Sequence, residues 1–453
     1  MSIIRFRTFI ILLLLAAYLI AEHGFMLVRI PPTSQFGVPL AEITILLFAI
    51  TFVWDIKRIR SFALVAPLAP LFVWWGLGLA QATLGFYHHG IWAIRDASHL
   101  IDSFFIWIGF VVAATPGFLC TFSRWLRFTC NLSVIYGLLF PLREQLAGFS
   151  PQIPAPGGYV APLLFNYASG ALMLLIGAAR LLLDRVRVFW LHPSIVPGLL
   201  IAFSIAAFQA RTTYLHVMVL LLFLAYSNPR ASLQMAAGLF IGLMLLLLLL
   251  KAGLNLNGRL GHQFSLDFLL KHFAAIWGQD GDGEVVGAAS GTFQRLRWWA
   301  KIWVDVTSEP TKLLFGLGYG IPLTDFRYIN DVLVREPHNS TISVFARLGT
   351  LGLIAFLWFQ IALTRVLLKT FRHLKTAGDD VWCVNLSIIG LYILFVWVFT
   401  IGEDGLEKPS TAIPFYFFWG VVLRVAYAIK VVARTPDECR LNGGSSLTAY
   451  PIG

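Results

Sequence analysis

An arginine at the border of an apolar stretch is the first candidate for chemistry. It stands in Gln209-Ala-Arg211-Thr-Thr-Tyr-Leu215, between two runs of apolar residues. A charged side chain in a membrane is costly, about 2.5–3.5 kcal/mol at the centre of a spanning helix and less at its end. The side chain could extend to the lipid headgroups. Alternatively it binds an anion, because a guanidinium grips phosphate through two hydrogen bonds and keeps its charge. We favour an anion-binding role for Arg211.

A histidine precedes another apolar run, in Glu336-Pro337-His338-Asn339-Ser340. Proline is typical of a helix start, and the positive end of the helix dipole disfavours a protonated ring. A neutral imidazole accepts a proton, which suits a general base for a sugar hydroxyl. A plain capping residue at the membrane interface fits the same place, and position alone favours that alternative.

An aromatic segment lies between these two residues in the chain. Helical spacing puts Phe293, Leu296, Trp299 and Trp303 on one face of residues 292–306, with Arg295 and Arg297 flanking that stripe on opposite sides. The pattern predicts an amphipathic helix in the headgroup plane, and a second is expected near 264–277. The tryptophans could stack on sugar rings, although anchoring at the interface is commoner.

Further ionisable residues gather at two places. We expect the members of one group, within an apolar segment, to neutralise one another or to serve function: Arg95, Asp96, His99 and Asp102. We interpret the members of the other as solvated charges of an acidic loop: Glu403, Asp404 and Glu407. The glycines from Gly316 to Gly320 follow no strand, so they predict a tight turn.

The composition identifies the setting of these residues. Of 453 residues, 58% are hydrophobic and 13% are charged, and the mean hydropathy is +0.77. Soluble domains have about 25% charged residues, so the chain is predicted to be an integral membrane protein. The basic residues behind the net charge of +11 are scattered between apolar runs, which fits membrane orientation better than a groove that follows nucleic-acid phosphates. The four cysteines are too dispersed for a disulfide scaffold or a metal cluster.

A spanning helix needs about 20 mostly apolar residues, and the sequence predicts an all-α fold with about 12 of them. They lie near 8–28, 36–54, 61–81, 97–115, 122–140, 159–181, 194–210, 212–227, 231–250, 340–364, 381–400 and 411–430. Nine helices therefore occupy 1–250 and three occupy 340–432. A large structured loop fills 251–339, and 433–453 form a tail.

Lysine and arginine gather on alternate connections, for example at Arg5 and Arg7, then Lys57 to Arg60. Cytoplasmic loops retain positive charge. We therefore expect both termini to be cytoplasmic and the 251–339 loop to lie outside the cytoplasm. Arg211 and His338 would then share the outer face.

The segment from Pro337 to Gly352 resembles the signature of the O-antigen ligase and polymerase superfamily, bacterial polytopic membrane glycosyltransferases. The ligase pattern H-[NSQ]-x9-G-x-x-[GTY] is met by His338, Asn339, Gly349 and Gly352. The partner pattern R-x3-L is met by Arg211 and Leu215. The likeness is specific over roughly 292–356, where the segment from Arg295 to Trp299 and the glycine-rich turn also look like that superfamily's outer loop.

The resemblance implies a glycosyltransferase of C-type architecture that needs no metal or other cofactor. Its donor would be a glycan on undecaprenyl diphosphate, at the periplasmic face of the bacterial inner membrane. Arg211 and Arg295, with Arg297 as the fallback, would bind the diphosphate, and His338 would assist the acceptor hydroxyl. Trp299, Trp303 and Asn339 would contact the acceptor or its sugars.

The leading hypothesis is an O-antigen ligase. Such an enzyme transfers lipid-linked polysaccharide onto lipid A core in lipopolysaccharide biosynthesis. A polymerase that joins lipid-linked repeat units onto a growing polysaccharide is second, because the two activities share the His-Asn segment. A protein O-glycosyltransferase is third. A transporter of lipid-linked sugars is the distant alternative, since we find no internal repeat. Besides membrane lipids, the expected partners are this donor and acceptor, and no nucleic acid.

Overall fold

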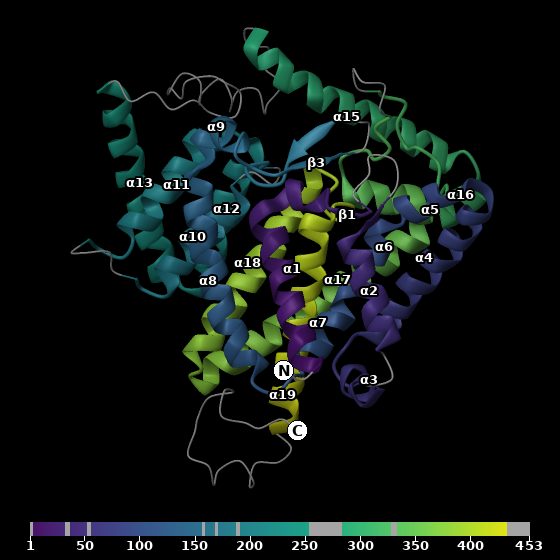
Figure 1. Ribbon diagram of the computed structural model, residues 1–453, viewed down its shortest axis with the longest axis horizontal. Coiled ribbons are helices and arrows are strands. Elements are labelled where there is room, and N and C mark those ends of the chain that lie inside the picture. The colour runs from purple at the N-terminus through teal and green to yellow at the C-terminus, as the bar shows by residue number, and fades with distance from the viewer. Residues whose placement is uncertain are drawn as a thin grey trace.

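The computed structural model of the chain is almost entirely helical (Figure 1). It describes residues 3–31, 37–51, 56–155, 159–167, 171–186, 191–252, 283–327 and 333–432. The strands in these ranges form two short antiparallel pairs, β1 (Arg29–Ile30) with β2 (Val38–Pro39) and β3 (Gln152–Pro154) with β4 (Val160–Pro162). The predicted all-α class is confirmed.

The helices follow the predicted apolar segments in order. Those before the large loop are α1 (Ile3–Met26), α2 (Leu40–Ile50), α3 (Ile56–Ala63), α4 (Leu68–His89), α5 (Ile91–Asp96), α6 (Ser98–Asp102), α7 (Phe105–Ala113), α8 (Phe118–Leu138), α9 (Arg143–Ala147), α10 (Leu172–Leu183), α11 (Ile195–Phe208), α12 (Arg211–Ser227) and α13 (Pro229–Lys251). The later ones are α15 (Gly283–Thr307), α16 (Pro310–Phe315), α17 (Ser340–Ala377), α18 (Asp380–Gly402) and α19 (Pro409–Val432).

Six of the described helices are long and apolar enough to cross a membrane, namely α1, α4, α13, α17, α18 and α19. A seventh span results if α8 and the segment that bends away from it by 50° are taken as one. The chain is therefore a multi-pass membrane protein, but this number falls short of the predicted twelve.

The other predicted spans are not long enough to cross a membrane, because their helices are interrupted or brief. The 97–115 segment is broken between α6 and α7, and the 159–181 segment begins as strand β4, which ends at Pro162. The helix of this segment, α10, starts only at Leu172. Others, such as α11 and α12, have fewer than 18 residues.

The division at Arg211 is observed as predicted. Helix α11 ends at Phe208, Gln209 takes a left-handed conformation with φ of 47°, and α12 begins at Arg211. Arg211 therefore occupies the first turn of a helix, at the positive end of its dipole.

Close backbone approach holds the centre of the bundle together. A Cβ atom on Gly109 of α7 would collide with the Phe417 carbonyl of α19, and one on Gly420 would collide with the Ile106 carbonyl. Small residues at such crossings let helices pack tightly in membranes. Around this contact, α19 carries a run of fully buried aromatic side chains from Phe415 to Trp419.

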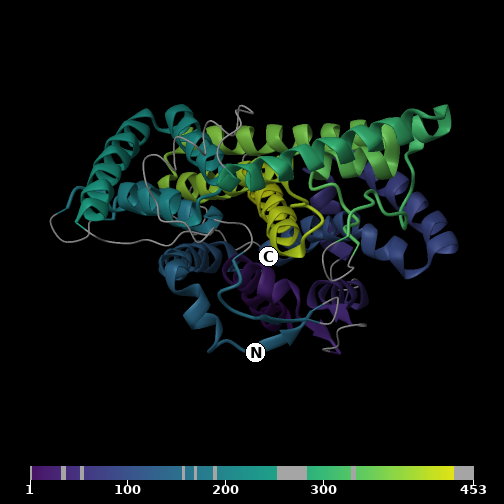
Figure 2. The same ribbon diagram turned by 90° about the horizontal axis from the view of Figure 1, so that it is seen from above.

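Helix α15 lies across one end of the bundle, whereas the start of α1 and the end of α19 lie at the other end (Figure 1). Seen from above, α15 runs over the bundle beside α17 (Figure 2). It contains the predicted amphipathic segment 292–306. The second amphipathic helix, expected at 264–277, and the tail at 433–453 lie outside the described residues.

Helix α17 bends sharply at Gly349, where φ is +65°. The bend releases carbonyl groups of the preceding turn, and the glycine-rich turn satisfies two of them. The Leu317 amide donates to the Ala346 carbonyl at 2.7 Å, and the Gly318 amide donates to the Arg347 carbonyl at 3.1 Å. The predicted tight turn thus fixes the direction of the first two turns of α17, which follow His338.

Candidate active site

His338 lies two residues before α17, in a left-handed conformation with φ of 53°. The next residue, Asn339, caps the helix: its Oδ1 accepts from the Ile342 amide at 3.0 Å. Its Nδ2 donates to the Ile401 carbonyl at the end of α18 at 2.9 Å. Asn339 therefore joins α17 to α18, and its two side-chain polar groups both have protein partners.

The histidine ring faces the loop between α18 and α19. Its Nδ1 lies 3.2 Å from Asp404 Oδ1 and 3.7 Å from Glu403 Oε2. The Nζ of Lys408 lies 2.6 Å from the same Asp404 oxygen and 3.3 Å from Glu403 Oε2. These three loop residues surround the Nδ1 side of His338 with two carboxylates and one ammonium.

Asp404 stays ionised despite its burial. Burial opposes its ionisation, but Lys408 and the His338 hydrogen bond outweigh burial and hold the pKa of Asp404 well below its usual value. A carboxylate accepts hydrogen bonds and cannot donate one. The Nδ1 of a neutral His338 therefore carries the proton, and Nε2 keeps the lone pair that a general base needs.

The acidic loop differs from its expected role as solvated charge. The Asp404 and Glu403 side chains are 16% and 28% exposed, and Glu407 accepts a hydrogen bond from Ser340 Oγ at the first residue of α17. Burial, and next the nearby Glu336, raise the pKa of Glu407 to about 8. Long-range pairing places this loop against the start of α17, which the local sequence does not reveal.

The predicted arginines differ in their surroundings. The Nη2 of Arg295 lies 3.0 Å from Glu403 Oε1, so Arg295 contacts the carboxylate beside His338. Arg211 lies close enough to Arg295 for their charges to repel. Two guanidinium groups that repel each other are suited to share an anion. Arg297 is exposed on another side of α15.

The tryptophans of α15 also divide by role. The predicted contact residue Trp299 donates from Nε1 to the Pro337 carbonyl at 2.9 Å and so holds the backbone before His338. Trp303 is 61% exposed and stacks on Phe345. The ring centroid of the buried Trp298 lies 5.8 Å from that of His338. The adjacent tryptophan pair in the sequence signals that one of the two rings faces the protein.

Behind the histidine loop lies a buried ionic network. Asp96 of α5 accepts two hydrogen bonds from Arg335, at 2.9 and 2.7 Å. Arg347 of α17 lies 3.1 Å from Asp96 and 2.9 Å from Glu336. Arg335 and Arg347 therefore share one carboxylate and clamp the segment that leads to His338.

This network corrects the expectation that the charges of residues 95–102 neutralise one another. Asp96 pairs with arginines from distant segments, and Arg95 lies over the Trp92 ring at 5.0 Å. His99 Nε2 lies 2.7 Å from the Tyr416 hydroxyl. Asp102 is fully buried. Arginine inside an apolar helix, as at position 347, was the signal that could have revealed the network.

The ligand atoms of His338, Glu403 and Asp404 lie within 4.8 Å of one another, a spacing that suits a metal ion. However, Lys408 already pairs with both carboxylates, and Arg295 pairs with the other Glu403 oxygen. A divalent ion would have to displace two cations. The donor set therefore fits an internal ion-pair network better than a metal centre.

The site combines an oriented histidine, two arginines within electrostatic reach of each other and a buried aromatic ring. This arrangement can accept a proton beside a bound anion. A scan against protein-family models finds no match for the chain, and no curated protein matches its sequence.

Proposed function

We propose that this chain is a membrane glycosyltransferase similar to O-antigen ligases. It would transfer a polysaccharide from undecaprenyl diphosphate onto a lipid A core, at the periplasmic face of the bacterial inner membrane. The proposal rests most on one observation: Asp404 orients His338 while Arg295 lies against the adjoining Glu403, within electrostatic reach of Arg211.

The reaction follows from these positions. The acceptor hydroxyl oxygen attacks the anomeric carbon of the donor sugar, and the bond from that carbon to the phosphate oxygen breaks. The electron pair leaves with the lipid diphosphate, and the hydroxyl proton passes to Nε2 of His338. Arg211 and Arg295 stabilise the negative charge that develops on the leaving diphosphate. Asp404 stabilises the imidazolium that forms.

Substitution tests this assignment directly. We expect His338→Ala and Arg211→Ala to abolish transfer by purified protein that is given donor and acceptor in detergent. Arg211→Lys fails as well, because a point charge cannot replace the guanidinium fork. The exposed His373→Ala and Arg365→Ala are matched controls on α17. Normal product from either site variant, at wild-type protein abundance, would remove that residue from the mechanism.

A gene-deletion strain separates the related activities. A ligase defect strands long glycan chains on the carrier and leaves bare lipid A core, whereas a polymerase defect leaves single repeat units on the carrier. Loss of glycan from proteins alone points to a protein O-glycosyltransferase. The absence of any accumulated lipid-linked glycan would overturn the assignment, and conversion of donor by purified protein would exclude transport as the only activity.

A further inference from the structure

A cavity of about 220 Å³ opens between α15, α16 and the glycine-rich turn. Its polar lining comes from the two helices and the short link between them: Lys301, Asp305, Ser308 and Lys312. Its apolar lining comes mainly from the turn that follows α16: Ile302, Leu317, Ile321, Pro322 and Leu323. The volume is about seven times that of a liquid water molecule, about 30 Å³. This is the scale of one sugar ring.

The cavity lies on the face of α15 that meets His338. Trp298 is followed at helical spacing by Lys301, Ile302 and Asp305, which therefore share one side of the helix. Asp305 follows Trp298 by seven positions, which amounts to about 10 Å along the helix axis. A chain that leaves the His338 site along this face reaches the cavity after a few sugar units.

Hydrogen bonds from residues outside the cavity fix the cavity wall that faces α15. Arg347 donates to the Ile321 carbonyl, and the Leu323 amide donates to the Arg335 carbonyl at 2.9 Å. Both arginines belong to the buried network on Asp96. The cavity is therefore pre-formed, which lowers the cost of ordering when a ligand binds.

The charges around the cavity disfavour an anion. Lys301 pairs with Asp325 at 3.4 Å, and Lys312 pairs with Glu309 at 2.6 Å. The Asp305 carboxylate has no ion pair within the described part of the chain. Both lysines of the lining already have a carboxylate partner, and the Asp305 carboxylate adds a negative charge to the lining. Carboxylates accept hydrogen bonds from hydroxyl groups, and the apolar wall suits the C–H face of a sugar.

We propose, on the basis of the glycosyltransferase assignment above, that this cavity is a subsite for an uncharged sugar residue of the glycan chain. Asp305 accepts hydrogen bonds from the sugar hydroxyls, Lys301 and Ser308 donate to them, and Ile321 packs against the ring. The same chemistry fits a sugar of the donor chain or of the acceptor, and the experiment distinguishes the two.

Kinetics on the purified full-length protein provide the first test. The variants are Asp305→Ala, which removes the acceptor, and Ile321→Trp, which fills the cavity. We expect the KM for one glycan substrate to rise about five- to tenfold, the effect of about one hydrogen bond, with kcat within twofold. A rise in the donor KM assigns the cavity to the donor chain, and a rise in the acceptor KM assigns it to the acceptor. Unchanged KM values for both overturn the proposal.

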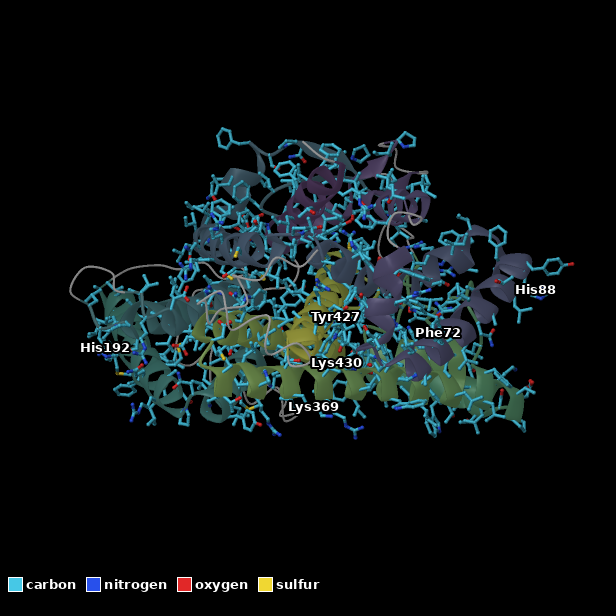
Figure 3. The ribbon with its side chains drawn as sticks, turned by 90° about the horizontal axis from the view of Figure 1, so that it is seen from below. Phe72, His88, His192, Lys369, Tyr427 and Lys430 are labelled. Atoms are coloured by element: carbon cyan, nitrogen blue, oxygen red, sulfur yellow. The ribbon has the colours of Figure 1, made fainter. Side chains whose placement is uncertain are left out.

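A binding measurement makes the test independent of catalysis. The probes are lipid-free polysaccharide from the source strain's carrier and its deacylated core oligosaccharide, titrated onto His338→Ala protein in nanodiscs. Ile321→Trp in that background should weaken binding of one probe. Lys369→Ala, an exposed lysine on α17 labelled in the view from below, should not (Figure 3). If Ile321→Trp leaves the binding of both probes intact, the subsite is contradicted, even where transfer by the wild-type protein is confirmed. Binding of a probe together with no transfer by the wild-type protein contradicts the glycosyltransferase alone.

Discussion

The same Oδ1 atom of Asp404 lies 3.2 Å from His338 Nδ1 and 2.6 Å from Lys408 Nζ. The histidine precedes α17, while the other two residues belong to the loop between α18 and α19. This three-membered chain fixes both the tautomer and the direction of the ring, as a carboxylate does for other catalytic histidines. The loop is therefore part of the candidate active site.

Asp404→Asn should reduce kcat by about 10²–10³, within the range that general base catalysis contributes. The amide can donate to Nδ1, which favours the tautomer that protonates Nε2. The KM for the donor should stay close to wild type, because the arginines are untouched. Initial rates of glycan transfer at several donor concentrations measure both constants.

The double variant His338→Ala/Asp404→Asn should be no slower than His338→Ala, since the carboxylate acts through the ring. An additive further loss would mean that Asp404 contributes independently. Asp325→Asn is the control for a carboxylate at the surface.

Asp96→Ala should destabilise the protein by about 3–5 kcal/mol, the cost of removing one partner from a buried ion pair. Arg335 and Arg347 would then lose the carboxylate that they share. The melting temperature in detergent measures this loss, and Asp325→Ala should leave it unchanged. Equal melting temperatures for wild type and Asp96→Ala would show that the network does not support the fold.

The sequence predicted the helical class and the order of the apolar helices, because long apolar segments in a membrane can satisfy their backbone only as helices. Their lengths were less predictable. The segment 159–181 is mostly apolar, yet β4 ends at Pro162 and α10 begins only at Leu172. Hydropathy shows that a segment is apolar, and it does not show where a strand or a break shortens its helix.

Part of the candidate site could also be foreseen. Arg211 at a helix start and His338 before an apolar helix are local features, and the structure places both as the sequence indicated. Asp404 and Asp96 could not be assigned in this way. Each has a partner at least 66 positions away, His338 for Asp404 and Arg335 for Asp96, and such pairings follow only from the packing of α5, α17 and α18.

Gly349→Ala should lower activity and stability together. At φ of +65° an alanine is strained, and its Cβ would come within 2.5 Å of the Gly316 nitrogen. The bend of α17 would shift, and with it the residues that carry His338. We expect a loss of about 1–3 kcal/mol in stability, measured by thermal unfolding, and at least a tenfold loss in transfer rate. Gly76→Ala, whose added Cβ meets no atom within 4 Å, is the control. Wild-type behaviour of Gly349→Ala would mean that the bend adapts freely.

Glu407 should make the stability of the protein depend on pH. Burial, and next the charge of Glu336, raise its pKa to about 8, whereas an unfolded glutamate titrates near pH 4.3. Between these values the folded state binds more protons than the unfolded state, so the free energy of unfolding falls as pH rises. Above about pH 8 both states are ionised and this group causes no further decline. Glu407→Gln removes the effect. The melting temperature of this variant, relative to that of wild type, should therefore rise as the pH is raised from about 5 to 8. Glu309→Gln, at an exposed ion pair, should show no such gain. A constant difference between Glu407→Gln and wild type over this range would mean that Glu407 is ionised in the folded protein.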